Sequence, residues 1–258
     1  MKLEYRLYDP TGNVTVLVAS PVPEAIQPAV AERLMALEPK AEQVGFLTEA
    51  DGADIALRMA GGEFCGNAAM CAAVYAAEAR GIERGAVTVR VSGAAEPISA
   101  EVALQPDGSW QGVVDMPRPA AIERHMLPGV GEAPVVRFDG ITHIVLTDPM
   151  PRPLAERQAR VWCAALGAEA LGLLFFDRRT ERMTPLVFVP AAGTLCWENA
   201  CASGTAAVGA YLAAREGGAA DVTLRQPGGW LRIEAADGAL RLTGTVRAGA
   251  RRQAEIDN

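Results

Sequence analysis

The chain has 258 residues, half of them hydrophobic and 21% charged, and its formal net charge is −7 at pH 7. This composition is typical of a soluble globular protein with two modest domains or one large one. An acidic surface repels phosphate groups, so nucleic acid is not expected as a partner.

The rare residues exclude further classes. Lys2 and Lys40 are the only lysines, so a pyridoxal-phosphate Schiff base has almost nowhere to form. The two histidines and five cysteines show no zinc-ligand spacing, and no metal is expected. The N-terminus lacks a signal-peptide pattern, and no apolar run reaches the roughly 18 residues of a membrane span. We therefore expect a cytoplasmic protein with reduced thiols and no membrane partner.

In chain order, the first strong helix signal follows the segment Glu63-Phe64-Cys65-Gly66-Asn67. An alanine-rich stretch continues to Arg80-Gly81. Alanine favours helix, and glycine commonly follows a helix C-terminus. A β-branched run at 87–89 predicts a strand after this helix, and Asp107-Gly108 predicts a hairpin. The proline-containing segment from 116 to 134 is interpreted as a linker.

The same order of signals repeats in the second half. Asn199-Ala200-Cys201-Ala202-Ser203 precedes an alanine-rich stretch that ends before Gly217-Gly218, and a β-branched run at 222–224 and a hairpin at Asp237-Gly238 follow. The two cysteines are 201 − 65 = 136 residues apart. We therefore predict an α+β fold with two pseudo-symmetric halves, residues 1–120 and 121–258, each a mostly antiparallel sheet with one buried alanine-rich helix; the family resemblance described below implies that each sheet wraps around this central helix.

The duplicated cysteines carry the candidate chemistry. The first N–H groups of a helix lack intrahelical partners and carry the positive end of the helix dipole, which lowers a thiol pKa and can bind a carboxylate. Two such helix starts predict two thiols and two carboxylate-binding turns around one cavity. The alternative is that Cys65 and Cys201 are small core residues, as most buried cysteines are. The unmatched Cys71, Cys163 and Cys196 are interpreted as structural.

Two motifs, Gly61-Gly62-Glu63-Phe64-Cys65-Gly66-Asn67-Ala68 and Trp197-Glu198-Asn199-Ala200-Cys201-Ala202-Ser203-Gly204-Thr205, resemble those of the diaminopimelate epimerase family of cofactor-independent amino-acid racemases. The resemblance extends to Asn13, Gln43 and His143, and so covers nearly the whole chain. Within that family, the Gly-Gly-Glu-Phe-Cys and Trp-Glu-x-Ala-Cys forms are most similar to the histidine racemases of opine-metallophore synthesis.

The resemblance implies that Cys65 and Cys201 are catalytic, one taking the α-proton while the other delivers a proton to the opposite face. The substrate carboxylate is then expected on the backbone N–H groups of Gly66, Asn67, Ala202 and Ser203. The other implied site residues are Asn13 and Gln43 for substrate binding, and Glu63, His143 and Glu198 for pKa modulation or contact with the ammonium. The resemblance further implies an amino-acid substrate, no cofactor and a homodimer.

Departures from diaminopimelate epimerases affect the groups that hold the distal zwitterion of their substrate. Ile141-Thr142-His143 stands where those enzymes carry Asn-Pro-His, and 190–193 replaces an expected Glu-Arg pair. Apolar or weakly polar replacements cannot offset the desolvation of a second ammonium and carboxylate, which argues against diaminopimelate as the substrate. Histidine is the substrate that the resemblance implies. The alternatives are diaminopimelate epimerase itself, a broad-specificity racemase and a non-catalytic amino-acid-binding protein.

Overall fold

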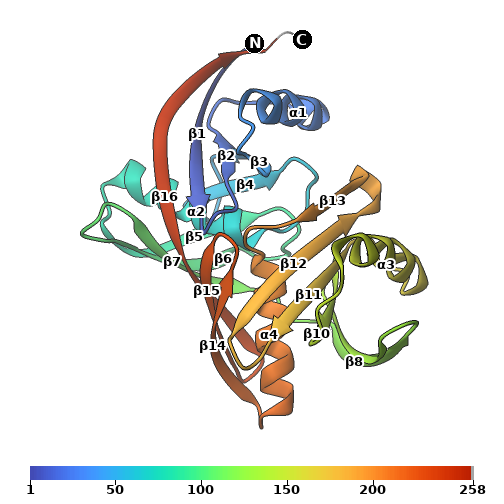
Figure 1. Cartoon of the computed structure of the whole chain (residues 1–258). Helices are drawn as coiled ribbons and strands as arrows, with labels where there is room; N and C mark the ends of the chain where they lie inside the picture. Colours follow the sequence, from blue (N-terminus) through green and yellow to red (C-terminus); the bar gives the residue numbers. More distant parts are fainter. Residues whose placement is uncertain (257–258) are drawn as a thin grey trace. The chain divides into compact units, whose positions relative to one another are not determined.

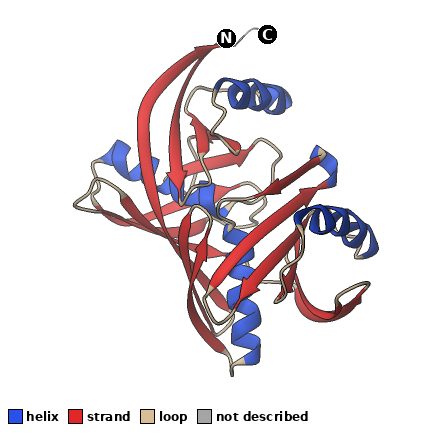
Figure 2. Ribbon diagram, viewed as in Figure 1, coloured by secondary structure: helices blue, strands red, loops and turns tan. Residues whose placement is uncertain are grey.

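The computed structural model describes residues 1–256 and has a mixed α/β architecture, with the secondary structure shown in Figures 1 and 2. The chain divides into two compact units. Unit 1 contains residues 1–115 and the C-terminal segment from Thr243, and unit 2 contains residues 116–242. No helix among the described residues is both long and apolar enough to cross a membrane.

The elements of unit 1 are β1 (Lys2–Pro10), β2 (Thr15–Val18), η1 (Glu24–Ile26), α1 (Gln27–Leu37), β3 (Gln43–Thr48), β4 (Ile55–Met59), α2 (Gly66–Arg80), β5 (Arg84–Val91), β6 (Ile98–Leu104) and β7 (Trp110–Met116). The last strand, β16 (Ala239–Glu255), passes from unit 2 into unit 1. There it pairs antiparallel with β1, from Lys2 opposite Glu255 to Pro10 opposite Val246. This pairing explains why the C-terminal segment belongs to the first unit.

Most strand pairs of unit 1 are antiparallel, but β2–β3 and β4–β5 are parallel. Parallel neighbours need a crossover connection, and α1 and α2 provide the two crossovers. Helix α2 packs against β1, β2, β4, β5 and β6, and most of its residues are buried. Its many alanines allow this burial, because a small side chain lets the strands approach the helix closely. Gly81, at a φ of 68°, ends the helix as predicted.

The elements of unit 2 are β8 (Ala121–Leu127), β9 (Gly131–Arg137), β10 (Thr142–Leu146), α3 (Arg152–Ala165), β11 (Leu171–Asp177), β12 (Arg182–Val189), η2 (Pro190–Ala192), β13 (Thr194–Trp197), α4 (Ala202–Arg215), β14 (Ala219–Gln226) and β15 (Gly229–Ala236). The pairs β10–β11 and β12–β14 are parallel, and α3 and α4 lie in the corresponding crossovers. Helix α4 packs against β9, β10, β14 and β15. A Cβ at Gly209 would come within 2.6 Å of Ile233, so glycine allows α4 to lie close to β15.

Each unit has one other helix, α1 or α3, which the sequence patterns did not predict. Each of these helices covers a separate apolar cluster. In α3, Ala155, Ala159, Trp162 and Cys163 are buried at helical spacing against β9 to β12. In α1, Val30, Ala31 and Leu34 pack against residues of β1, β2 and β3.

The predicted helices and both Asp-Gly hairpins are confirmed. The division between the units falls at the start of the predicted linker at 116–134, but most of that segment forms strands rather than a linker. Residues 121–127 and 131–137 pair as the antiparallel strands β8 and β9. Pro128-Gly129 is the turn of this hairpin, and Gly129 has a φ of 84°. Pro134 lies in β9 opposite Arg124 of β8, one residue beyond the end of the β9–β10 ladder at Val135.

The division between the units also differs from the predicted boundary between residues 120 and 121. Unit 2 begins at Met116 and ends at Leu242. The chain therefore crosses between the units twice rather than once, because β16 completes the strand pairing of β1.

Candidate functional site

Cys65 is the N-cap residue of α2. Its backbone is extended, with φ −136° and ψ 110°, and its thiol sulfur accepts a hydrogen bond from the Ala68 amide at 3.4 Å. The first backbone bond of the helix runs from the Ala69 amide to the Cys65 carbonyl at 2.9 Å. Gly66 and Asn67, whose backbone N–H groups are the predicted carboxylate donors, come before Ala69 in the first turn of the helix. The half-buried Cys65 thiol therefore lies at the positive end of the helix dipole.

A network of side-chain hydrogen bonds runs from the Cys65 thiol to Gln43 and from there to Asn13 and Thr15. The thiol donates to Gln43 Oε1 at 3.1 Å, and Gln43 Nε2 donates to Asn13 Oδ1 and to Thr15 Oγ1, both at 2.7 Å. Asn67 Nδ2 also donates to Asn13 Oδ1, at 3.2 Å. The structure thus brings together four residues that the sequence singled out: Asn13, Gln43, Cys65 and Asn67.

Two further residues, which the sequence reasoning missed, complete this network. Asn13 Nδ2 donates to Glu42 Oε2 at 2.6 Å, and the buried Thr15 hydroxyl donates to the Asn13 carbonyl at 3.1 Å. Glu42 directly precedes Gln43, but a single glutamate after a helix carries no sequence signal that distinguishes it from a surface residue.

Glu63, predicted to tune a thiol pKa or contact the ammonium, lies in the loop that leads into Cys65. Its side chain is exposed and folds back over Gly61. Its carbonyl accepts a hydrogen bond from the Ser92 hydroxyl at 2.9 Å. A Cβ at Gly93 would overlap the backbone between Glu63 and Phe64, so a glycine there allows this loop to pack closely. The described contacts of Glu63 therefore hold the loop that leads into Cys65.

Cys201 is the N-cap residue of α4 in unit 2, with φ −117° and ψ 109°. Its thiol sulfur accepts from the Gly204 amide at 3.4 Å, and the first backbone bond of the helix runs from the Thr205 amide to the Cys201 carbonyl at 3.0 Å. The predicted donors Ala202 and Ser203 occupy the positions before that bond. In contrast to Cys65, Cys201 is only 5% exposed.

Burial raises the pKa of the Cys201 thiol well above its ordinary value. The negative charge of Glu198 and its hydrogen bond with the thiol raise this pKa further, while the Ser203 hydroxyl and the Gly204 amide lower it. Glu198 is therefore close enough to act on Cys201, and the thiol keeps its proton in this arrangement.

His143, on β10, reaches Cys201 through Ser203. Its Nε2 lies 3.0 Å from the Ser203 hydroxyl, which in turn lies 3.6 Å from the Cys201 sulfur. The imidazole is fully buried, and burial lowers the pKa of His143 to about 3. The imidazole ring is therefore neutral at physiological pH, and it can orient the Ser203 hydroxyl by a hydrogen bond. Gly172, opposite His143 on β11, makes room for the ring, because a Cβ at this position would overlap Nδ1.

Gln226 and Thr205 were missed by the sequence reasoning, yet they hold the backbone of Cys201. Gln226 Oε1 accepts from the Cys201 amide at 2.8 Å, and Gln226 Nε2 donates to the Thr205 hydroxyl at 2.8 Å. That hydroxyl donates to the Cys201 carbonyl at 2.7 Å. Gln226 lies 25 residues beyond Cys201, too far along the chain for a local pattern to reveal the contact.

The other cysteines have different environments. Burial raises the pKa of Cys71 and of Cys163, and the Cys163 thiol donates to the Ala168 carbonyl at 3.2 Å. These two therefore behave as buried core thiols, as predicted, whereas Cys196 is exposed.

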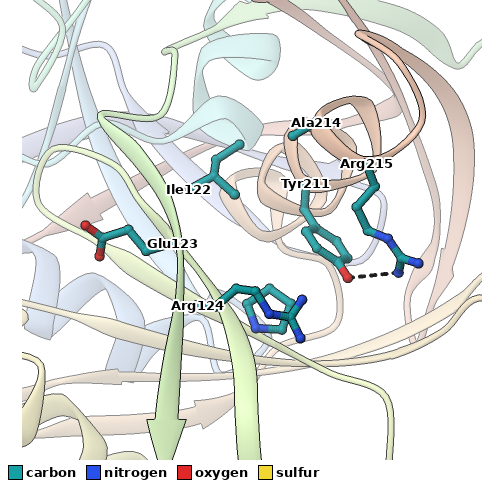
Figure 3. Close-up of a pocket in the computed structure, with 7 residues that line it drawn as sticks. Ile122, Glu123, Arg124, Tyr211, Ala214 and Arg215 are labelled. Carbon is teal, nitrogen blue, oxygen red and sulfur yellow. Dashed lines mark hydrogen bonds between the residues drawn. The ribbon is translucent and has the colours of Figure 1, made fainter.

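Two surface pockets lie away from both cysteines. One, of about 240 Å³, lies in unit 1, where Tyr8, Lys40 and Arg247 contribute to its lining. The other, of about 200 Å³, lies between β8 and α4 in unit 2 (Figure 3). There the Arg215 guanidinium donates to the Tyr211 hydroxyl at 3.0 Å. Neither of these two pockets is lined by a predicted site residue.

Comparisons with known proteins agree with these motifs. A family model described as the histidine racemase CntK N-terminal domain matches residues 2–251. A histidine racemase of Staphylococcus aureus is 30% identical over 247 residues, which cover 90% of this chain and 88% of that protein. A histidine racemase of Fusobacterium nucleatum is 29% identical over 240 residues, with 89% and 88% of the two chains covered.

Solved structures show the same fold at lower sequence identity. A structure described as a predicted epimerase from Pseudomonas aeruginosa matches with a TM-score of 0.76 and 17% identity, and the match covers 100% of both chains. A hydroxyproline epimerase from Agrobacterium vitis matches with a TM-score of 0.73 and 14% identity, covering 100% of this chain and 93% of that one.

Proposed function

We propose a substrate and a mechanism for this chain, which belongs to the histidine racemase CntK N-terminal domain family and is therefore an isomerase that racemises an amino acid. The proposed substrate is free histidine, interconverted between its L and D forms. The proposed catalytic groups are the thiols of Cys65 and Cys201, and the proposed reaction needs no cofactor.

One observation carries the mechanism: each cysteine is the N-cap of a buried helix, and its sulfur accepts an amide hydrogen bond at 3.4 Å. An amide donor and the positive end of a helix dipole both stabilise a thiolate. The same first-turn amides suit a carboxylate, and we assign this role to Gly66, Asn67, Ala202 and Ser203. They also stabilise the charge that moves onto the carboxylate as the α-carbon becomes planar.

The proposed reaction moves one proton off the α-carbon and another onto it. One cysteine, as thiolate, takes the α-proton, and the bonding electrons remain on the substrate as a planar carbanion. The other cysteine, as thiol, gives its proton to the opposite face and becomes the thiolate. The two sulfurs thus exchange protonation states in each turnover, and the reverse reaction uses them in the opposite order. Two bases favour inversion, because a single base returns the proton to the face it left.

The remaining predicted residues receive roles that follow from their contacts. Asn13 and Gln43 offer amide groups beside Cys65, suited to hydrogen bonding with the ammonium or imidazole of histidine. Glu198 acts on the pKa of Cys201, and His143 orients the Ser203 hydroxyl from its buried position. The Glu63 carboxylate keeps its proposed role in ammonium contact or in tuning Cys65, while its backbone carbonyl helps to hold the loop before that residue. A homodimer, a cytoplasmic location and pseudo-symmetry between the two halves stay predictions.

The test is a chiral assay of the purified protein against a panel of amino acids, run with a chelator and without pyridoxal phosphate. We expect L- and D-histidine to interconvert faster than the other amino acids, including diaminopimelate. Preference for diaminopimelate contradicts the proposed substrate, and similar rates across the panel indicate a broad-specificity enzyme. Binding of histidine without turnover contradicts catalysis. A strict requirement for added metal or pyridoxal phosphate contradicts the cofactor-independent mechanism.

Solvent labelling tests the use of two bases. In deuterium oxide, each direction should place deuterium mainly in the product enantiomer at early times, because the proton delivered comes from a second, solvent-exchanged thiol. Equal early labelling of substrate and product contradicts the two-thiol mechanism and points to one base.

A further inference from the structure

Gln226 closes a ring of hydrogen bonds around the backbone of Cys201. Its side chain accepts from the Cys201 amide and donates to the Thr205 hydroxyl, each at 2.8 Å, and that hydroxyl donates to the Cys201 carbonyl at 2.7 Å. Gln226 is 8% exposed and Thr205 is fully buried. The ring therefore pairs both backbone polar groups of Cys201 away from solvent.

A neighbouring contact ties the same segments together. The Gly228 amide, just past the end of β14, donates to the Asn199 carbonyl at 2.8 Å. The chain that leads into Cys201 is thus held to the end of β14 at two places, Asn199 and Cys201. Both the entry to the helix cap and the cap itself depend on the position of this strand end.

Helix α2, which starts at Cys65, has different side chains at the positions that correspond to Thr205 and Gln226. Ala69 follows Cys65 by the same four residues by which Thr205 follows Cys201. Val91 is the last residue of β5, as Gln226 is the last residue of β14. Alanine and valine side chains cannot donate or accept hydrogen bonds. An N-cap cysteine and a buried helix therefore form in unit 1 with alanine and valine at these two positions, so the Thr205–Gln226 pair is not a general requirement for starting such a helix.

We propose that Gln226, with Thr205, is a positioning residue for proton transfer at Cys201, an inference that rests on the proposed two-cysteine reaction. The ring fixes the peptide planes on both sides of the Cys201 Cα and so fixes the direction of the Cα–Cβ bond that carries its sulfur. It also occupies the Cys201 amide, which leaves the next amides of the first turn to face a carboxylate. The Cys201 thiol that the ring positions is buried and lies beside the Glu198 carboxylate.

The test compares Gln226→Met and Thr205→Val with the conservative variant Thr205→Ser, which keeps the hydroxyl. Displacement of a catalytic group by about 1 Å can cost about 10²-fold in rate. We therefore expect Gln226→Met and Thr205→Val to lower kcat by about 10- to 100-fold, with KM changed by less than about threefold. The double variant should lose little more than either single one, because both break the same ring. Thr205→Ser should retain most of the activity.

Isotope effects distinguish positioning from a loss of folded protein. Kinetic constants for α-deuterated L- and D-histidine report which proton transfer limits the rate. If transfer at Cys201 becomes slow, the isotope effect should rise for the enantiomer whose deuteron goes to Cys201 and fall for the other. A smaller fraction of folded enzyme lowers kcat without changing either isotope effect. Trp162→Phe, a core change in α3, serves as the control for general effects on stability.

Several outcomes overturn the proposal. One is an unchanged kcat in both Gln226→Met and Thr205→Val, and another is a lower kcat with isotope effects that stay as in the wild type. Loss of activity in Thr205→Ser equal to that in Thr205→Val also contradicts it. The proposed two-cysteine reaction has a separate test, because full activity of Cys201→Ser contradicts it. An inactive Cys201→Ser together with a fully active Gln226→Met rejects only the role of Gln226.

Discussion

Cys65 and Cys201 have the same local structure but different surroundings. Both cap a helix with an extended backbone and a sulfur that accepts an amide hydrogen bond at 3.4 Å. Cys65 is half-buried among the amides of Gln43, Asn13 and Asn67. Cys201 is 5% exposed and lies beside Glu198, which helps to raise its pKa. The repeated cap therefore places each thiol at the start of a helix, while the groups around the thiol set how readily it releases its proton.

The largest expected effect comes from removing either sulfur. Cys65→Ser and Cys201→Ser should each lower kcat by about 10²- to 10⁴-fold, because a hydroxyl is too weak an acid to replace either thiol in proton transfer. A chiral assay of D-histidine formation measures this loss, and Cys71→Ala is the matched control at a buried core thiol. Full activity in either serine variant would show that the reaction does not need both sulfurs.

The second prediction concerns a variant that changes the surroundings of Cys201 alone. In Gly172→Ala, the new Cβ overlaps His143 Nδ1, so the buried ring must move and its contact with Ser203 is strained. We expect a loss of about 1–3 kcal/mol in the free energy of unfolding, measured by urea denaturation. Gly85→Ala, on β5, is the control, since its Cβ would approach only Ile82 Cγ2, at 3.1 Å. Equal losses in the two variants contradict the role of Gly172.

The third prediction concerns the pH dependence of stability. Burial lowers the pKa of His143 to about 3, whereas an unfolded histidine titrates near ~6.5. Between these values the unfolded chain binds a proton that the folded chain does not, so the stabilising contribution is present above about pH 6.5 and is lost as pH falls toward 3. From pH 7 to pH 5 the loss should be about 2 kcal/mol.

The measurement for His143 is the difference between the wild type and His143→Gln in urea denaturation at the two pH values. Subtracting the variant removes the contribution of the carboxylates that titrate in the same range. If the two proteins lose the same stability between pH 7 and pH 5, the buried imidazole is not the cause.

The smallest expected effect is a shift in the pH dependence of one thiol. The charge of Glu198 raises the pKa of Cys201, so Glu198→Gln should lower that pKa. Alkylation of Cys201 by iodoacetamide, followed peptide by peptide in a mass spectrometer, should then begin at lower pH than in the wild type. The profile of Cys65 in the same samples is the internal control. A shift of both profiles, or of neither, contradicts a specific effect of Glu198 on Cys201.

Local sequence patterns predicted much of each unit. The alanine-rich runs after the cysteines are helices, the β-branched runs are strands, and both Asp-Gly pairs lie in hairpin turns. The segment with Pro128-Gly129 was misinterpreted because a turn and a linker share the same residues, and only the pairing of β8 with β9 distinguishes them. Helices α1 and α3 were missed, although the buried positions of α3 follow a helical spacing.

The amino-acid sequence alone locates the two helix caps, because capping depends on a cysteine and the few residues that follow it. The same reading cannot supply Gln226 for Cys201 or Gln43 for Cys65, since both partners come from strands far along the chain. Nor can it show that Cys201 is more deeply buried than Cys65. Burial and distant hydrogen bonds arise only when strands and helices pack together, and burial is the largest cause of the raised pKa of the Cys201 thiol.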